Sequence, residues 1–464
     1  MSDRFSRRPD GSGRYVLALD WRAPDAAFRS LSSRRLPVWL DSAGPVGPRS
    51  RFSYLCVDPV SVLEYRDGVL RHDGRVGEPL PFQALAGLVS RARRVVEPGP
   101  APFMGGVVGL LGYGLGTALE RLPARHAQDP DLPALWFGHY DLVLAFDRLQ
   151  RRCWLISTGN HPDQTALQRA ALLLGWLDQP PVPLTPIPTL SWHPDRTQDS
   201  YVGMIERTLD YIRAGDIFQA NLTMRHVADR PDGVDPASVH LALRARNPAA
   251  FGAYIGWGQG RALSSASPER FLSLDARGTI ETRPIKGTRP RGDDAASDAC
   301  AAEELARSEK DRAENLMIVD LMRNDLSRVA VPGSVAVPAL FEIESIATLH
   351  HLVSTVTARL RPDEDAITLL RATFPGGSVT GAPKIRAMQI IDALELSSRG
   401  PYCGSVVWIG EDGAMDSSIV IRTLMLGRAT IVAQAGGGIV ADSDPIGEYR
   451  EMLSKVAPLL AVFA

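Results

Sequence analysis

A lysine surrounded by arginines is the first feature of the sequence that could carry out chemistry. Lys286 lies in the stretch 284–291, with Arg283, Arg289 and Arg291 close by in sequence. Nearby positive charge and partial removal from water both favour the neutral amine, which is the form of lysine that attacks carbon. A solvated basic loop is the ordinary alternative for such a lysine. Lys286 is therefore a candidate nucleophile whose case depends on the rest of the chain.

Carboxylates at helical spacing are the second chemical signal. Glu448, Glu451 and Lys455 share one face of a helix that is predicted over 444–463. Glu314 lies in another helix, predicted over 303–328, just before its apolar half. Carboxylate oxygens suit Mg²⁺, so these side chains could hold one ion together. A solvated helix face with a Glu–Lys pair explains the spacing equally well.

Three further features favour a bound anion close to backbone. Arg422 falls among aliphatic residues in a strand predicted over 417–424, where a guanidinium needs a buried carboxylate as partner. Gly436 to Gly438 interrupt the following strand and leave its backbone open to a ligand. Gly287 would allow the same close approach beside Lys286. In an extended chain, alternation places Lys286 and Thr288 on one face.

The elements that position these residues fall into two regions. Six prolines in 179–194 prevent regular pairing or coiling, so a linker is predicted over 179–198. The first region covers 15–178 and the second covers 199–464. Within the second region, turn signals at short intervals predict an antiparallel meander over 251–285, and its last strand carries Lys286.

Composition excludes several classes of protein. The chain has 464 residues, of which 45% are hydrophobic and 22% charged, with a net charge of -2. This balance predicts a globular protein with an ample core, and it favours neither nucleic acid nor an anionic membrane as partner. The start of the sequence lacks the apolar core of a secretory signal, and the apolar run 105–116 is too short to span a bilayer. Four widely spaced cysteines without metal-ligand spacing are typical of the reducing cytoplasm.

Four motifs in the second region resemble those of the chorismate-utilising enzymes. The resemblance covers essentially all of 199–464, while 15–178 resembles the more variable N-terminal segment of that family. It implies an α+β fold like that of anthranilate synthase component I, in which antiparallel sheets pack on each other with flanking helices. The motifs occur in the family's order at 284–288, 314–325, 380–384 and 438–443.

Two positions choose a branch within this family. Anthranilate synthase large subunits usually have alanine where this chain has Lys286. Isochorismate and salicylate synthases usually carry a water-activating lysine where this chain has Gln219. Ala250 to Gly252 also differ from the Pro-Tyr-Met stretch that binds tryptophan in feedback-regulated anthranilate synthases. The combination resembles the aminodeoxychorismate synthases, the branch that forms 4-amino-4-deoxychorismate on the route to p-aminobenzoate and folate.

The resemblance also implies roles for individual residues. Lys286 would add to the ring of chorismate, Glu269 would protonate the departing hydroxyl group, and His351 would have a supporting role. Mg²⁺ on Glu314 and Glu451, with Glu448 close by, would hold one carboxylate of chorismate. The other contacts with chorismate would come from Gly287, Thr288, Tyr402, Arg422, Gly436, Gly437, Gly438 and Lys455.

The same resemblance implies a partner. Ammonia would come from a separate glutamine amidotransferase subunit, aminodeoxychorismate synthase component II, because none of the four cysteines has the glycine-flanked setting of an amidotransferase nucleophile. A heterodimer is therefore expected. Two alternatives stay open: anthranilate synthase component I, which Lys286 disfavours, and a catalytically silent chorismate-binding regulatory subunit, which the full set of reactive residues disfavours.

Overall fold

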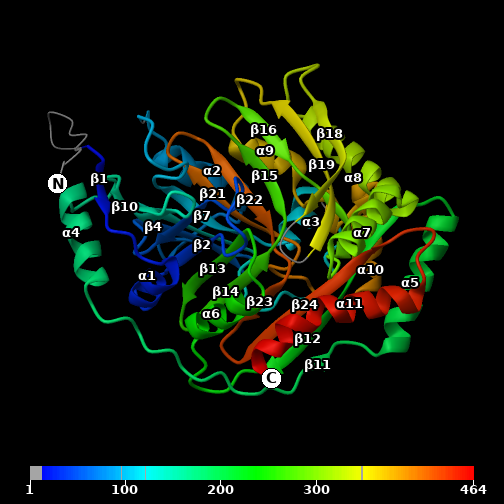
Figure 1. Ribbon diagram of the computed structural model, residues 1–464. Coiled ribbons are helices and arrows are strands. Elements are labelled where there is room, and N and C mark those ends of the chain that lie inside the picture. Colours follow the sequence, from blue (N-terminus) through cyan, green and yellow to red (C-terminus); the bar gives the residue numbers. More distant parts are fainter. Residues whose placement is uncertain (1–12, 96, 121, 346–348) are drawn as a thin grey trace.

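Two antiparallel sheets of 12 strands each form the centre of the molecule, and helices surround them (Figure 1). The computed structural model describes residues 13–95, 97–120, 122–345 and 349–464. This architecture confirms the predicted α+β class, because sheets and helices are both extensive while the strand pairs in both sheets run antiparallel.

The first sheet extends from the N-terminal strand to the edge of the C-terminal region. Its order is β1 (Tyr15–Leu19), β10 (Arg152–Ser157), β9 (Leu142–Asp147), β3 (Phe52–Cys56), β2 (Val38–Asp41), β13 (Phe251–Gly258), β14 (Arg261–Ser267), β23 (Thr423–Leu426), β24 (Thr430–Ile439), β12 (Gln219–Asp229) and β11 (His193–Pro194). The short strand β20 (Gly381–Ala382) also pairs with β12.

The second sheet carries the lysine stretch at one end. Its order is β17 (Ile285–Pro290), β19 (Leu349–Arg359), β16 (Thr279–Thr282), β15 (Arg270–Leu274), β22 (Met415–Ile419), β21 (Ser405–Gly410), β7 (Gly106–Leu111), β8 (Leu135–Tyr140), β4 (Ser61–Arg66), β5 (Val69–His72) and β6 (Arg75–Gly77). Strand β18 (Ala336–Ser345) pairs with β19 as well.

Eleven α-helices are found among the described residues. They are α1 (Pro24–Leu31), α2 (Pro81–Ala92), α3 (Gly114–Glu120), α4 (Ala166–Leu177), α5 (Gln198–Arg213), α6 (Pro236–Arg246), α7 (Ala295–Arg307), α8 (Glu309–Ser327), α9 (Ala366–Thr373), α10 (Lys384–Leu394) and α11 (Pro445–Leu460). Among the described residues, every helix is too short or too polar to cross a membrane.

The regions predicted on either side of the proline-rich stretch share both sheets. Strand β2 pairs with β13, and β7 pairs with β21. One core cluster accordingly contains buried side chains from both regions, such as Val107 and Ile419. A second cluster packs α5, α10 and α11 against β12 and β24, with Met452 and Leu222 fully buried. Because each such side chain contributes about 1.5–3 kcal/mol, this packing fixes α11 along β24 (Figure 1).

The chain crosses between the sheets at two adjacent places. Strand β14 pairs with β23 in the first sheet, whereas β15 pairs with β22 in the second. The connections 268–269 and 420–422 therefore run side by side, and the Ala266 N–H donates to the Arg422 carbonyl at 3.0 Å. The meander predicted over 251–285 is thus divided between two sheets. Pro268, which has no N–H for a ladder bond, lies at the division.

Candidate active site

Lys286 lies beside the glycine-rich part of β24. A Cβ atom added to Gly438 would be 3.5 Å from Nζ of Lys286 and 1.9 Å from Nε2 of Gln219. Gln219 is 1% exposed, and neither of its amide atoms has a hydrogen-bond partner among the described residues. The missing side chain at Gly438 therefore makes room for both groups, and both are directed to the same place.

The strand of Lys286 continues β16 along β19. Both strands pair with β19 in one register, and Pro284 separates them. At Gly287 the register shifts, so Lys286 pairs with Leu352 and Thr288 with His351. The simple alternation predicted for Lys286 and Thr288 does not hold across this bulge. Gly287 has φ +77, and a Cβ there would be 2.8 Å from the side chains of Asp311 and Leu305, so helix packing accounts for this glycine.

The three arginines near Lys286 are neutralised by partners. Arg283 pairs with Glu344, Arg289 with Glu304 and Asp311, and Arg291 with Asp298. The positive charge that these arginines bring close to Lys286 is therefore paired with carboxylates and not free. Instead, the Lys286 ammonium acts on the carboxyl groups of Glu269, Glu314 and Glu451.

Glu269 occupies the crossing between β14 and β15. Its side chain is 8% exposed, and burial raises its pKa above the ordinary value of 4.5. A hydrogen bond from the Ser378 side chain and the charge of Lys286 both offset part of this rise in pKa. A raised pKa favours the protonated form, and a protonated carboxyl group close to a lysine amine has the property that general acid catalysis needs.

Glu314 and Glu448 form a pair of acidic groups between α8 and α11. Burial raises the pKa of Glu314, and the Glu448 carboxylate raises it further, whereas Lys286 and Lys310 lower it. Glu448 accepts a hydrogen bond from Ser443 at 2.7 Å and lies 3.8 Å from Nζ of Lys310. Among the described residues no group of three or more His, Cys, Asp or Glu side chains is arranged to hold a metal ion.

Glu451 and Lys455 extend this charged region along α11. They form an ion pair at 2.5 Å, and Nζ of Lys455 also donates to the Gly436 carbonyl at 3.0 Å. Burial favours the neutral form of Glu451, but the charges of Lys455, Lys310 and Lys286 together outweigh burial and lower the pKa of this carboxyl. The predicted helix of 444–463 is confirmed, with Asp444 as its N-cap.

Arg422 is close to this region but outside any strand. It has φ +53 and lies between β22 and β23, so the continuous strand predicted over 417–424 is wrong. The positive φ belongs to the turn by which the chain passes from one sheet to the other. Its guanidinium donates to the Lys455 carbonyl at 2.9 Å. The charges of Tyr402 and Glu451 raise the pKa of Arg422. Burial lowers the pKa of Arg422 and raises that of Tyr402.

His351 faces the strand of Lys286. Its Nδ1 and the Thr288 hydroxyl are hydrogen-bonded at 3.0 Å. Burial lowers the pKa of His351 below its ordinary value of 6.5, and Arg422 adds to this effect while Glu344 opposes it. The imidazole is therefore neutral at pH 7 and can donate or accept one hydrogen bond with a ligand.

Sequence reasoning did not assign roles to Lys310, Asn315 or Ser378. One signal could have identified Lys310: of the 51 lysines and arginines in the chain only four are lysines. Three of these four, Lys286, Lys310 and Lys455, lower the pKa of Glu314 or Glu451 through their charge. The fourth, Lys384, pairs with buried Asp325 at 2.5 Å. Asn315 and Ser378 lie in the motifs at 314–325 and beside 380–384, but their roles depend on contacts with distant segments.

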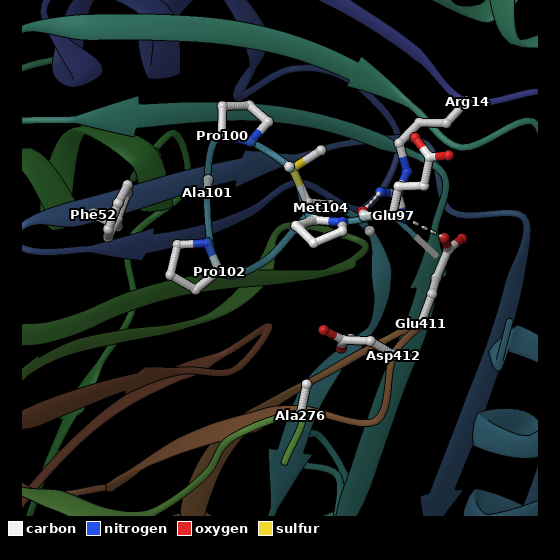
Figure 2. Close-up of a pocket in the computed structure, with 14 residues that line it drawn as sticks. Arg14, Phe52, Glu97, Pro100, Ala101, Pro102, Met104, Ala276, Glu411 and Asp412 are labelled. Atoms are coloured by element: carbon white, nitrogen blue, oxygen red, sulfur yellow. Dashed lines mark hydrogen bonds and ion pairs between the residues drawn. The ribbon is translucent and has the colours of Figure 1, made fainter. Parts of the chain in front are cut away.

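A cavity is found away from these residues. It has a volume of about 430 Å³ and is lined by Phe52, Met104, a proline-rich loop and the acidic side chains of Glu97, Glu411 and Asp412 (Figure 2). Arg14 neutralises Glu411 at 2.9 Å. The cavity contains no lysine and none of the predicted site residues. The grouping of reactive side chains around Lys286 therefore lies outside this cavity.

Known proteins of one family match nearly the whole chain. Residues 37–461 match the family described as chorismate binding enzyme. Aminodeoxychorismate synthase component 1 of Klebsiella aerogenes is 42% identical over 455 residues, which cover 96% of this chain and 98% of that protein. Anthranilate synthase component 1 of Thermus thermophilus is 39% identical over 457 residues, 96% of each chain. The crystal structure of anthranilate synthase component I from Streptococcus pneumoniae has a TM-score of 0.78 at 31% identity, and covers 90% of this chain and 93% of that one.

Proposed function

The chain belongs to the family of chorismate binding enzymes, and on this premise we propose that it converts chorismate and ammonia to 4-amino-4-deoxychorismate. This is the activity of an aminodeoxychorismate synthase component 1, the name of relatives that are 42% identical over 96% of the chain. One observation carries the proposal: Nζ of Lys286 lies next to the open backbone of Gly438 and acts on the buried acid Glu269.

In the first step the neutral Lys286 amine adds its lone pair to the ring of chorismate. The ring double bonds shift, and the bond between C4 and its hydroxyl oxygen breaks. The departing hydroxyl takes the proton of Glu269 and leaves as water, while the new secondary amine keeps both of its protons as an ammonium group, so that Nζ can later leave as a neutral amine. The raised pKa of Glu269 supports this role, because the group must be protonated when it acts.

In the second step ammonia takes the place of the lysine. Its lone pair forms the bond to C4, the double bonds shift back, and the bond between the ring and Nζ of Lys286 breaks. The proton lost by the incoming nitrogen can return to the Glu269 carboxylate. Chorismate and ammonia thus give 4-amino-4-deoxychorismate and water, with Lys286 and Glu269 regenerated.

Positively charged groups would hold the two carboxylates of chorismate. Lys455 donates to the Gly436 carbonyl of β24, whose Gly436 to Gly438 allow close approach, and Arg422 donates to the Lys455 carbonyl. Thr288, Tyr402 and the Gly287 backbone would add contacts, and neutral His351 would donate or accept one hydrogen bond. The partial burial of these charges strengthens their attraction for an anion.

Mg²⁺ is the cofactor that we propose for this site. Glu314 and Glu448 fit it, because two carboxylates that repel each other in a partly buried place favour a divalent cation, and Mg²⁺ commonly takes one or two protein carboxylates. Glu451 could join them on releasing Lys455. When bound, the ion would neutralise one carboxylate of chorismate. Lys286 and Glu269 carry out the steps described above.

A glutaminase subunit is the proposed partner. The relatives' designation as component 1 supports a second component that supplies ammonia. All four cysteines of this chain are free, which supports our proposal that the protein acts in the cytoplasm.

Anthranilate synthase component 1 is the second candidate function. A relative of that name is 39% identical over 96% of this chain, only slightly less than the aminodeoxychorismate synthases. Its reaction would release pyruvate from the same substrate. Lys286 argues for the first candidate, because direct addition of ammonia to the ring needs no amine at this position.

Product analysis separates the candidates. The purified chain is mixed with chorismate, MgCl₂ and ammonium at mildly alkaline pH, and the products are identified by mass spectrometry. We expect 4-amino-4-deoxychorismate without pyruvate. Anthranilate with pyruvate would support the second candidate and overturn the first, and complete absence of turnover would leave a chorismate-binding regulatory subunit.

A further inference from the structure

Asn315 is fully buried directly behind the strand that carries Lys286. It follows Glu314 on α8, and its Nδ2 donates to the Pro284 carbonyl at 3.4 Å. Its Oδ1 accepts a hydrogen bond from the Ser354 hydroxyl of β19. The Asn315 amide is therefore hydrogen-bonded on both sides, on one side to Pro284 directly before strand β17 and on the other to Ser354 of β19.

The position of Pro284 explains why such a contact is needed. Proline has no N–H, so the ladder between the β16–β17 line and β19 loses a bond two residues before Lys286. The Pro284 carbonyl remains, and it accepts from the Ser354 N–H at 3.3 Å as well as from Asn315. The Ser354 hydroxyl is fixed in turn, because it accepts from the Phe341 N–H at 3.0 Å.

These contacts also set the distance between two parts of the site. Glu314 and Asn315 are consecutive residues of one helix, so a bond from Asn315 to Pro284 holds the Glu314 carboxylate relative to Lys286. On the other side, Pro284 and Glu269 line one small cavity of about 10 Å³, which leaves little room for the strand to move. Gly287, which follows Lys286, packs closely against Asp311 of the same helix.

We infer that Asn315 is a positioning residue for the reaction: it holds Pro284 so that the Lys286 amine meets the substrate at the correct distance from Glu314. The inference rests on the proposed function, in which Lys286 is the nucleophile. An asparagine is suited to this place because one side chain supplies both the acceptor for Ser354 and the donor for Pro284.

Three variants test the inference. Asn315→Asp keeps the shape and the acceptor for Ser354 but removes the donor to Pro284. Ser354→Ala removes the other support, and the double variant combines the two changes. Asn324→Asp is the matched control, since Asn324 is exposed on the same helix. Values of kcat and KM for chorismate are measured at saturating Mg²⁺ and ammonium, together with Tm.

We expect kcat of Asn315→Asp to fall about tenfold to a hundredfold while KM changes less than about twofold, because misplacement of a reacting group affects the chemical step. Ser354→Ala should lower kcat less, and the double variant should resemble Asn315→Asp, because the two residues act in one network. Asn324→Asp should match the wild type. Should Asn315→Asp fail to fold, kcat of Ser354→Ala decides the question.

Two results would overturn the inference. One is wild-type kcat in both single variants, and the other is a loss that lies in KM alone or follows the decrease in Tm. Formation of anthranilate by the wild type would instead contradict the proposed function, and the kcat values of the variants would still show whether Asn315 positions the site.

Discussion

Lys286 has the role that is most specific to this chain, and two substitutions separate its charge from its nucleophilicity. Lys286→Ala removes both properties, while Lys286→Arg keeps the charge on a guanidinium that does not act as a nucleophile. We expect both variants to lose roughly a thousandfold in kcat or more. The measurement is the rate of 4-amino-4-deoxychorismate formation with ammonium as donor. Substantial activity in Lys286→Arg would show that charge alone suffices.

Glu269 combines a catalytic role with a cost in stability. Its folded-state pKa is raised, so the folded protein binds the proton more tightly than the unfolded chain does. Protonation of Glu269 therefore stabilises the folded protein fully below about pH 4.5, and this stabilisation is lost as the pH rises through the folded-state pKa of Glu269. Glu269→Gln cannot ionise. It should therefore lower kcat about 10²- to 10⁴-fold and yet raise Tm at pH 8 by about 1–2 °C.

The pH dependence provides the control for Glu269. The Tm difference between Glu269→Gln and the wild type should narrow as the pH is lowered towards 4.5, because the wild-type carboxyl then takes up its proton. Thermal unfolding at several pH values measures this difference. A Tm advantage that does not depend on pH would refute the assigned protonation state.

Lys310 competes with a cation for the acidic pair of the site. It lies 3.8 Å from Glu448 and also acts on Glu314 and Glu451. Removal of its charge in Lys310→Met should tighten Mn²⁺ or Mg²⁺ binding about threefold to tenfold, since the group is half exposed and screened by water. Lys310→Arg is the matched control. Calorimetric titration measures the affinity, and weaker binding in Lys310→Met would contradict the assignment.

At the level of elements, the glycines of β24 have different functions. A Cβ on Gly436 would be 2.0 Å from the Leu222 carbonyl, which is backbone and cannot move away. At Gly438 only the side chains of Gln219 and Lys286 are in the way. Gly436→Ala should therefore lower Tm by a few degrees. Gly438→Ala should lower Tm less than Gly436→Ala, because the end of the Gln219 side chain can move whereas backbone cannot, and it should lower kcat about tenfold or more. Equal effects of the two substitutions on Tm would argue against this division.

Local patterns predicted those elements whose signals lie within a few residues. Helix α11 begins after its Asp444 cap, as predicted. The helix predicted over 303–328 is two helices, because Ser308 ends α7 and caps α8. Division of the meander and the turn at Arg422 were not predictable, because a choice between sheets depends on pairing with distant strands. For the same reason, the sequence did not show that Asn315 contacts Pro284.

As a whole molecule, the protein should depend on an external source of ammonia for amination of chorismate. Cys56, Cys153 and Cys403 are buried, and burial raises the pKa of the Cys403 thiol to about 12, which removes its nucleophilic form. Cys300 is exposed on α7, distant in sequence from any glycine-rich turn. The isolated chain should therefore use ammonium but release no glutamate from glutamine. Glutamine hydrolysis by this chain alone would contradict the proposed heterodimer.

A covalent bond between Lys286 and the substrate can be detected directly by peptide mass measurement. The purified chain is mixed with chorismate and Mg²⁺ in the absence of ammonium, quenched with acid and digested. We expect the peptide containing Lys286 to gain the mass of chorismate less one water, and ammonium to remove this adduct. An unmodified Lys286 peptide in an enzyme that forms 4-amino-4-deoxychorismate at the normal rate would show that Lys286 is not the nucleophile.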